Sequence, residues 1–141
     1  MLAIRPARPL DASALAPLLA QLGYDPGAEH VKRWLCRHDP QRDFVWVAEL
    51  QQQPVGLIAL HLIPLLHAPG ELARITALVV SEDARGQGVA TRLVEHAEQH
   101  ARARGAARME VTSAGHRAGA HAFYLAQGYA EPGQKRFLKD L

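Results

Sequence analysis

The stretch from Ile75 to Leu93, ITALVVSEDARGQGVATRL, contains the features that decide the fold. Its opening run, ITALVV, is continuously apolar and has the length expected for a strand covered on both faces. From Val89 to about Arg104 the apolar residues recur at helical spacing, which predicts an amphipathic helix. Two glycines, Gly86 and Gly88, stand directly before that helix. The sequence therefore predicts a central strand, a glycine-containing turn and a helix, in that order.

The turn before this helix has the properties of an anion site. The first backbone N–H groups of a helix have no partner inside it, and the helix dipole favours negative charge at that end. Gly86 and Gly88 lack a Cβ, so a ligand can approach the backbone closely, and Arg85 adds a charged hydrogen-bond donor. Phosphate or pyrophosphate fits this arrangement, although a turn that uses glycine only for its φ angle has the same sequence. The chain has neither a Walker string nor a Rossmann fingerprint, which needs Gly or Ala where Thr91 stands.

Strands and helices alternate along the rest of the chain, which favours α/β layering. The segments on either side of the connection QQQP are rich in branched and aromatic residues, so they predict an antiparallel hairpin. A first helix is capped by Asp11 or Ser13 and ends near Gly23. The expected strands are Leu2–Ile4, Phe44–Leu50, Val55–Ile63, Ile75–Val80, Met109–Ser113 and the tail from Tyr129 to Leu141, and the other expected helices are Ala28–His38 and Arg117–Gln127.

Composition limits the classes of function. The 141 residues, 48% of them hydrophobic, suit a single domain spanning 1–141 with a substantial core. Sixteen Lys and Arg interleave with fourteen Asp and Glu for a formal charge of +2, which argues against a nucleic-acid surface. Cys36 is the single cysteine, which suits a reducing, cytoplasmic location. We expect no signal peptide and no membrane span.

Two motifs resemble the signatures of the GNAT superfamily of N-acetyltransferases. Arg85–Ala90, RGQGVA, after an apolar strand, resembles the acetyl-coenzyme A motif Arg/Gln-x-x-Gly-x-Gly/Ala. Arg117–Tyr124, RAGAHAFY, followed by Gly128–Tyr129, resembles the second signature at the expected distance. The specific resemblance covers about 74–129, and Phe137–Lys139 is similar to the last strand of the family. The first 70 residues agree in layout alone.

The resemblance implies a mixed, mostly antiparallel, twisted sheet with helices on both faces. The sheet is splayed between the strands Ile75–Val80 and Met109–Ser113, and acetyl-CoA lies in the opening. Backbone groups near Leu78 and Val80 pair with the pantetheine arm. Many family members carry Asn where this chain has Arg117, so Arg117 either contacts the cofactor phosphates or caps a helix. The resemblance assigns the pyrophosphate to the backbone amides of Arg85, Gly86, Gln87, Gly88, Val89 and Ala90.

The resemblance also implies the catalytic groups. Tyr124 is the general acid that protonates the departing thiolate of coenzyme A, a role that suits a phenol. The attacking amine must lose a proton, and we assign the general base to Glu71, with Glu110 and His116 as alternatives. Each of these three side chains also suits a solvated surface, and enzymes of this type can work without a dedicated base.

The favoured function is therefore transfer of an acetyl group from acetyl-CoA to a primary amine by direct attack. Two alternatives are a catalytically silent acyl-CoA-binding regulatory module and a protein or peptide N-acetyltransferase. A small-molecule acceptor is slightly favoured, with His61 and His67 near its pocket, and a homodimer follows by analogy. No metal is expected, because His96 and His100 share a helix face without a carboxylate or thiolate to complete a site, and we expect this face to be an ordinary polar one.

Overall fold

The computed structural model describes residues 1–112 and 118–141. In this part of the chain one sheet has the strand order β1-β2-β3-β4-β5. The pairs from β1 to β4 are antiparallel, and β5 runs parallel to β4. This confirms the mixed, mostly antiparallel sheet. The strands are β1 (Leu2–Pro6), β2 (Asp43–Leu50), β3 (Gln53–Pro64), β4 (Glu71–Val80) and β5 (Arg108–Val111).

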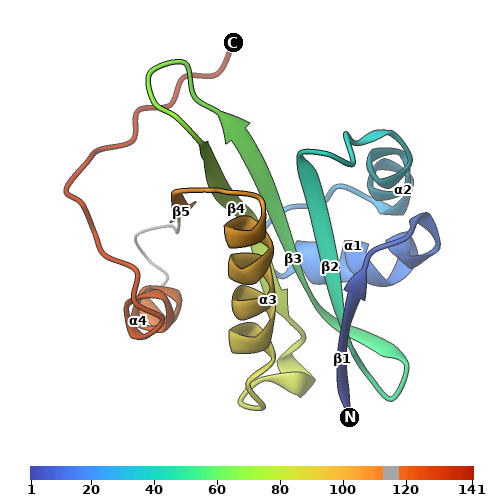
Figure 1. Ribbon diagram of the computed structural model, residues 1–141. Coiled ribbons are helices and arrows are strands. Elements are labelled where there is room, and N and C mark those ends of the chain that lie inside the picture. The colour runs from blue at the N-terminus through green and yellow to red at the C-terminus, as the bar shows by residue number, and fades with distance from the viewer. Residues whose placement is uncertain (113–117) are drawn as a thin grey trace.

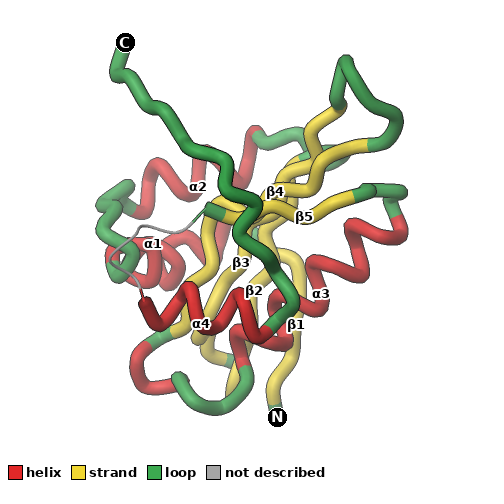
Figure 2. Tube along the Cα trace, turned by 90° about the vertical axis from the view of Figure 1, so that its left-hand side faces the viewer, coloured by secondary structure: helices red, strands yellow, loops and turns green. Residues whose placement is uncertain are grey.

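Helices cover both faces of the sheet, as expected. In Figures 1 and 2, α1 and α2 lie on one side of the sheet and α3 on the other, with α4 beyond β4. The helices are α1 (Ala12–Ala20), α2 (Ala28–Arg37), α3 (Val89–Ala103) and α4 (Ala118–Ala126), with short 3-10 turns at Pro9–Asp11 and Glu82–Ala84. Each observed helix agrees with its prediction to within a few residues.

A β-bulge in β4 changes which of its residues face each helix layer. The partners are Leu60 and Ile75 on one side of the bulge and Ala59 and Ala77 on the other, so Thr76 is the extra residue. A bulge redirects the side chains that follow it. Ile75 accordingly packs in the core under α3, whereas Ala77 packs toward α1 and α2.

The pairing of β5 with β4 ends directly before this bulge. In the described residues, β5 accompanies β4 from Leu72 to Ile75, where it pairs with Arg108 to Val111. β4 then continues to Val80, paired with β3. The two strands therefore part in the region where the splay was expected.

Close packing holds the start of α3 against the sheet. Gly56 on β3 lies so near the helix that a Cβ there would meet the Val79 carbonyl oxygen at 3.0 Å and methyl groups of Val89 and Leu93 at 3.3 Å. Val89 and Leu93 are buried in the same core. The contact fixes the helix N-terminus relative to β4.

The predicted C-terminal strands are wrong. Residues 129–141 form no strand, and Phe137 and Leu138 are 88% and 76% exposed. In Figure 1 this tail runs past the β5 side of the sheet. A strand needs a neighbour to accept its hydrogen bonds, and Pro132 has no N–H to contribute to a ladder.

The expected polar face at His96 and His100 is also wrong. Both rings are half-buried, with centroids 5.0 Å from the Trp46 ring, and His100 lies 4.3 Å from Phe44. Apolar burial lowers the pKa of both imidazoles, since it penalises the charged ring.

Candidate functional site

The turn between β4 and α3 is open to a ligand. Gly86 and Gly88 have φ angles of +79° and +77°, and a Cβ on either would meet no atom within 4 Å. Gly88 caps α3 without a side-chain hydrogen bond, and the four residues 85–88 are exposed. The first amides of α3 therefore face free space at the positive end of the helix dipole. This geometry fits the pyrophosphate of a coenzyme.

Other members of the predicted coenzyme site surround this turn. The Arg85 Nε donates to the Val80 carbonyl at 3.4 Å, and its Nη2 donates to Gln21 Oε1 at 3.5 Å. Both bonds are long and exposed, so the guanidinium can exchange them for a phosphate. Val89 is buried and reaches the site through its backbone alone, whereas the Gln87 side chain is exposed. Leu78 and Val80 lie where β4 has parted from β5.

Tyr124 lies half-buried on α4 within an aromatic group. Its ring is 5.3 Å from Phe123 and 5.8 Å from Tyr129. The Tyr129 hydroxyl donates to Glu98 on α3 at 2.9 Å, and burial followed by this bond raises the Tyr129 pKa. The group therefore ties α4 to α3, next to the helix that carries the glycine turn.

The structure describes two of the three candidate bases, Glu71 and Glu110. Glu71 begins β4 and forms an ion pair with Arg42. Glu110 lies on β5, where its carboxylate is 3.0 Å from Arg74. His116 lies outside the described residues, as does Arg117. Both carboxylates thus already pair with an arginine. Both also lie beside the first half of β4, away from the glycine turn.

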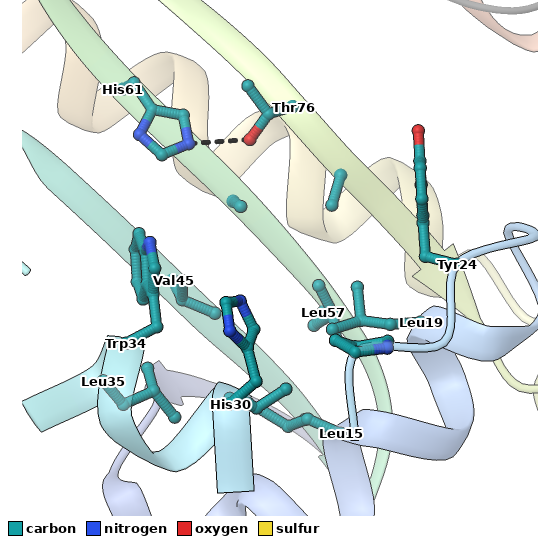
Figure 3. Close-up of a pocket in the computed structure, with 14 residues that line it drawn as sticks. Leu15, Leu19, Tyr24, His30, Trp34, Leu35, Val45, Leu57, His61 and Thr76 are labelled. Carbon is teal, nitrogen blue, oxygen red and sulfur yellow. Dashed lines mark hydrogen bonds between the residues drawn. The ribbon is translucent and has the colours of Figure 1, made fainter. Parts of the chain in front are cut away.

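A cavity of about 360 Å³ lies between the sheet and the helices α1 and α2. Five lining residues carry a polar group on the side chain: Tyr24, His30, Trp34, His61 and Thr76. Figure 3 shows His30 and Trp34 rising from α2 opposite His61 and Thr76 on the strands. His61 lines this cavity as expected, whereas His67 is exposed and does not. Apolar groups form the rest of its wall: Leu15, Leu19, Pro26, Val31, Leu35, Val45, Leu57, Ala59 and Ala77.

Two hydrogen bonds hold the His61 ring. Its Nδ1 is 2.9 Å from Asp43 Oδ1 on β2, and its Nε2 is 2.7 Å from Thr76 Oγ1 on β4. Burial alone would raise the pKa of Asp43, but hydrogen bonds from His61 and from the Asp39 amide outweigh it and lower the pKa overall. No sequence pattern indicates Asp43 or Thr76, because their approach to His61 depends on strand register and on the bulge.

The described residues also bear on metals and membranes. No group of three or more His, Cys, Asp and Glu side chains in 1–112 and 118–141 is arranged to hold a metal ion. Within the same residues, every helix is too short or too polar to cross a bilayer.

Comparison with known proteins gives the family. The model of the Acetyltransferase (GNAT) family matches residues 14–129. The chain belongs to this family. The match runs from α1 to the end of the second motif, and so includes the cavity, the glycine turn and Tyr124.

One curated relative is an aminoalkylphosphonate N-acetyltransferase of Salmonella typhimurium, 39% identical over 87 residues. The matched part is 62% of this chain and 56% of that relative, so it spans little more than half of the relative's length. Among solved structures, a ribosomal-protein-alanine N-acetyltransferase from Brucella melitensis has a TM-score of 0.83 at 19% identity over all of both chains. An aminoglycoside acetyltransferase from a soil metagenome has a TM-score of 0.82 at 22% identity, over 99% of this chain and 96% of that one. These two likenesses show the shared fold.

Proposed function

We propose that this protein transfers the acetyl group of acetyl-CoA to the primary amine of a small molecule with an apolar body. The observation that carries the proposal is the largely apolar cavity under α1 and α2, whose wall includes Thr76 at the bulge where β4 and β5 part. Such a cavity accepts a small apolar molecule next to the opening assigned to the thioester.

The coenzyme end of the site supports the same proposal. Acetyl-CoA supplies the activated acetyl group. The amides from Arg85 to Ala90 hold its pyrophosphate, with the Arg85 guanidinium as an additional donor. Leu78 and Val80 offer backbone groups to the pantetheine arm on the open side of β4. Arg117 lies outside the described residues, and both of its proposed roles, contact with the cofactor phosphates and a helix cap, stay open.

Tyr124 provides the proton for the leaving group in this proposal. Attack by the amine breaks the carbon–sulfur bond, and the thiolate that departs takes a proton from the Tyr124 hydroxyl. The aromatic contacts with Phe123 and Tyr129 restrict the orientation of the Tyr124 ring. Restricted orientation favours a proton donor that must meet a single atom.

The cavity wall favours one class of acceptor. Among the described residues no carboxylate side chain lines it, and its polar side chains are two imidazoles, an indole, a phenol and a hydroxyl. A polycationic acceptor would enter with several ammonium groups and no opposite charge to pair with them. The related enzyme named for aminoalkylphosphonates supports a small acceptor, and the apolar wall favours an aliphatic or aromatic monoamine.

The proposal is tested by the release of coenzyme A from acetyl-CoA, with mass detection of the acetylated product. The amines are phenylethylamine, isoamylamine, aminoethylphosphonate, an aminoglycoside and a peptide with a free N-terminus. We expect the highest kcat/KM with the first two amines. Turnover confined to the peptide or the aminoglycoside would contradict the proposed acceptor class. Binding of acetyl-CoA without turnover of any amine would favour a regulatory module.

A further inference from the structure

We propose that the Thr76 hydroxyl and the His61 imidazole form the path by which the acceptor amine loses its proton, with Asp43 as the positioning residue for His61. This inference rests on the proposed function and adds the base of the reaction. It replaces Glu71 in that role.

The three side chains come from three neighbouring strands. Asp43 on β2 stands opposite His61 on β3, and His61 stands opposite Arg74 on β4. Thr76 lies two residues beyond Arg74, at the bulge, and its hydroxyl reaches His61 Nε2 at 2.7 Å. His61 and Thr76 both line the cavity. The path therefore begins at the acceptor and leads to the Asp43 carboxylate.

Hydrogen-bond chemistry fixes the direction of this path. An ionised carboxylate only accepts, so the His61 Nδ1 at 2.9 Å from Asp43 must carry the proton. In the neutral ring Nε2 then has the free lone pair, and the Thr76 hydroxyl donates to it. A hydroxyl that donates to an imidazole has its own oxygen lone pairs available to an incoming N–H.

The proposed acetyl transfer moves one proton from the amine and one to the sulfur. The amine nitrogen forms the bond to the acetyl carbon and loses one proton to Thr76 Oγ1. The Thr76 hydroxyl proton passes to His61 Nε2, which becomes an imidazolium paired with Asp43. The carbon–sulfur bond breaks, and Tyr124 protonates the sulfur. Proton return from His61 to Tyr124 through solvent restores both groups.

Glu71 is less well placed for this proton transfer. It stands five residues before Thr76 on β4, which is roughly 16 Å along a strand, and its carboxylate pairs with Arg42. Glu71 is also absent from the cavity wall. A carboxylate in this position needs a chain of waters to reach the amine.

The decisive experiment measures kcat at saturating phenylethylamine and acetyl-CoA across pH for wild type and four substitutions at three positions. His61→Gln is expected to lower kcat about 100-fold and to remove the acidic limb of the profile that His61 produces. Thr76→Val is expected to lower kcat about tenfold and Thr76→Ser to restore it, since serine keeps the hydroxyl. Asp43→Asn is expected to move the acidic limb.

The charged and titratable groups near His61 come from several elements. They are Asp43 on β2, Arg74 and its partner Glu110 on β4 and β5, Tyr24 before α2, His30 on α2, and His38 directly after α2. Because His30 and His38 also carry imidazoles, the acidic limb is assigned to His61 only if it disappears in His61→Gln and persists in both His30→Gln and His38→Gln.

Two matched variants complete the test. His67→Gln removes an exposed imidazole of the neighbouring loop and is expected to leave kcat unchanged. Glu71→Gln is expected to lower kcat less than His61→Gln does. If wild type acetylates the amine and His61→Gln keeps both its kcat and its acidic limb, or if Glu71→Gln alone removes that limb, the inference is overturned. Absence of turnover in wild type would instead overturn the proposed function.

Discussion

At the scale of single residues, Gly88 and Gly105 share a backbone conformation but differ in their proposed roles. Their φ angles are +77° and +81°, and a Cβ at either position meets no atom within 4 Å. Gly88 starts α3 beside the proposed pyrophosphate, whereas Gly105 follows the other end of the same helix. Replacing each in turn separates the cost of the φ angle from the cost of blocking the ligand.

Gly88→Val is expected to weaken acetyl-CoA binding about tenfold or more, because one lost charge-assisted contact already has this effect. Gly105→Val is expected to lose about as much stability as Gly88→Val and to keep the affinity of wild type for acetyl-CoA. Titration calorimetry of the folded proteins measures the affinity of each variant. Equal affinities in the two variants would contradict the assignment of the pyrophosphate to this turn.

The residues of the site differ in how far the sequence predicts them. The sequence predicts the role of Gly86, Gly88 and Arg85, because a helix N-terminus is a local feature and its free amides follow from the helix itself. The pairing of His61 with Asp43 and Thr76 is not local. It depends on which residues the register of β2, β3 and β4 places side by side, and on a bulge that no sequence pattern predicts.

At the scale of elements, α3 carries two histidines whose burial links stability to pH. His96 and His100 pack against Trp46, and burial lowers the pKa of each below its usual value of 6.5. Among the described residues, His100 Nε2 is buried without a hydrogen-bond partner. The unfolded chain therefore binds protons more readily at these positions, and stability falls as the pH drops below about 6.5.

We expect the free energy of unfolding, measured with urea, to be lower at pH 5.5 than at pH 7.5. The double substitution His96→Leu with His100→Phe is expected to reduce this difference, because neither new side chain titrates. His67→Gln, at an exposed position, is the control and should retain it. A pH dependence equal in the double variant and in wild type would show that other groups cause it.

The elements themselves were largely predictable. The apolar run Ile75–Val80 lies within β4, and the periodicity from Val89 predicted the full length of α3. Both signals are local, since each depends on neighbouring residues of one element. The tail from Tyr129 was predicted as strand from the order of elements along the chain, and Phe137–Lys139 also from its similarity to the last strand of the family. A strand exists only beside a partner, and residues 129–141 have none in this structure.

At the scale of the whole molecule, we retain a homodimer as a proposal. Exposed apolar side chains gather in the C-terminal part of the chain, at Leu125, Phe137 and Leu138. In the described residues, β5 pairs on one side alone, and an unpaired edge is a place where a second chain adds a strand. The tail of a second copy is the proposed occupant.

Light scattering after size-exclusion chromatography measures this state. We expect twice the mass of the 15.4 kDa chain for wild type, and one chain mass for the double substitution Phe137→Lys with Leu138→Lys. Replacement of exposed Leu66 by Lys, in the loop between β3 and β4, is the control and should leave the mass of wild type. A monomeric wild type would contradict the dimer.

The central claim is that this chain acetylates a small amine and that Tyr124 donates a proton to the leaving thiolate. It is tested most directly by the rate of coenzyme A release with phenylethylamine, for wild type and Tyr124→Phe, beside the affinity of each for acetyl-CoA. We expect turnover by wild type, a kcat lower by about 100-fold or more in Tyr124→Phe, and affinities that agree within about twofold. Equal turnover by the two proteins, or none by wild type with any amine, would contradict it.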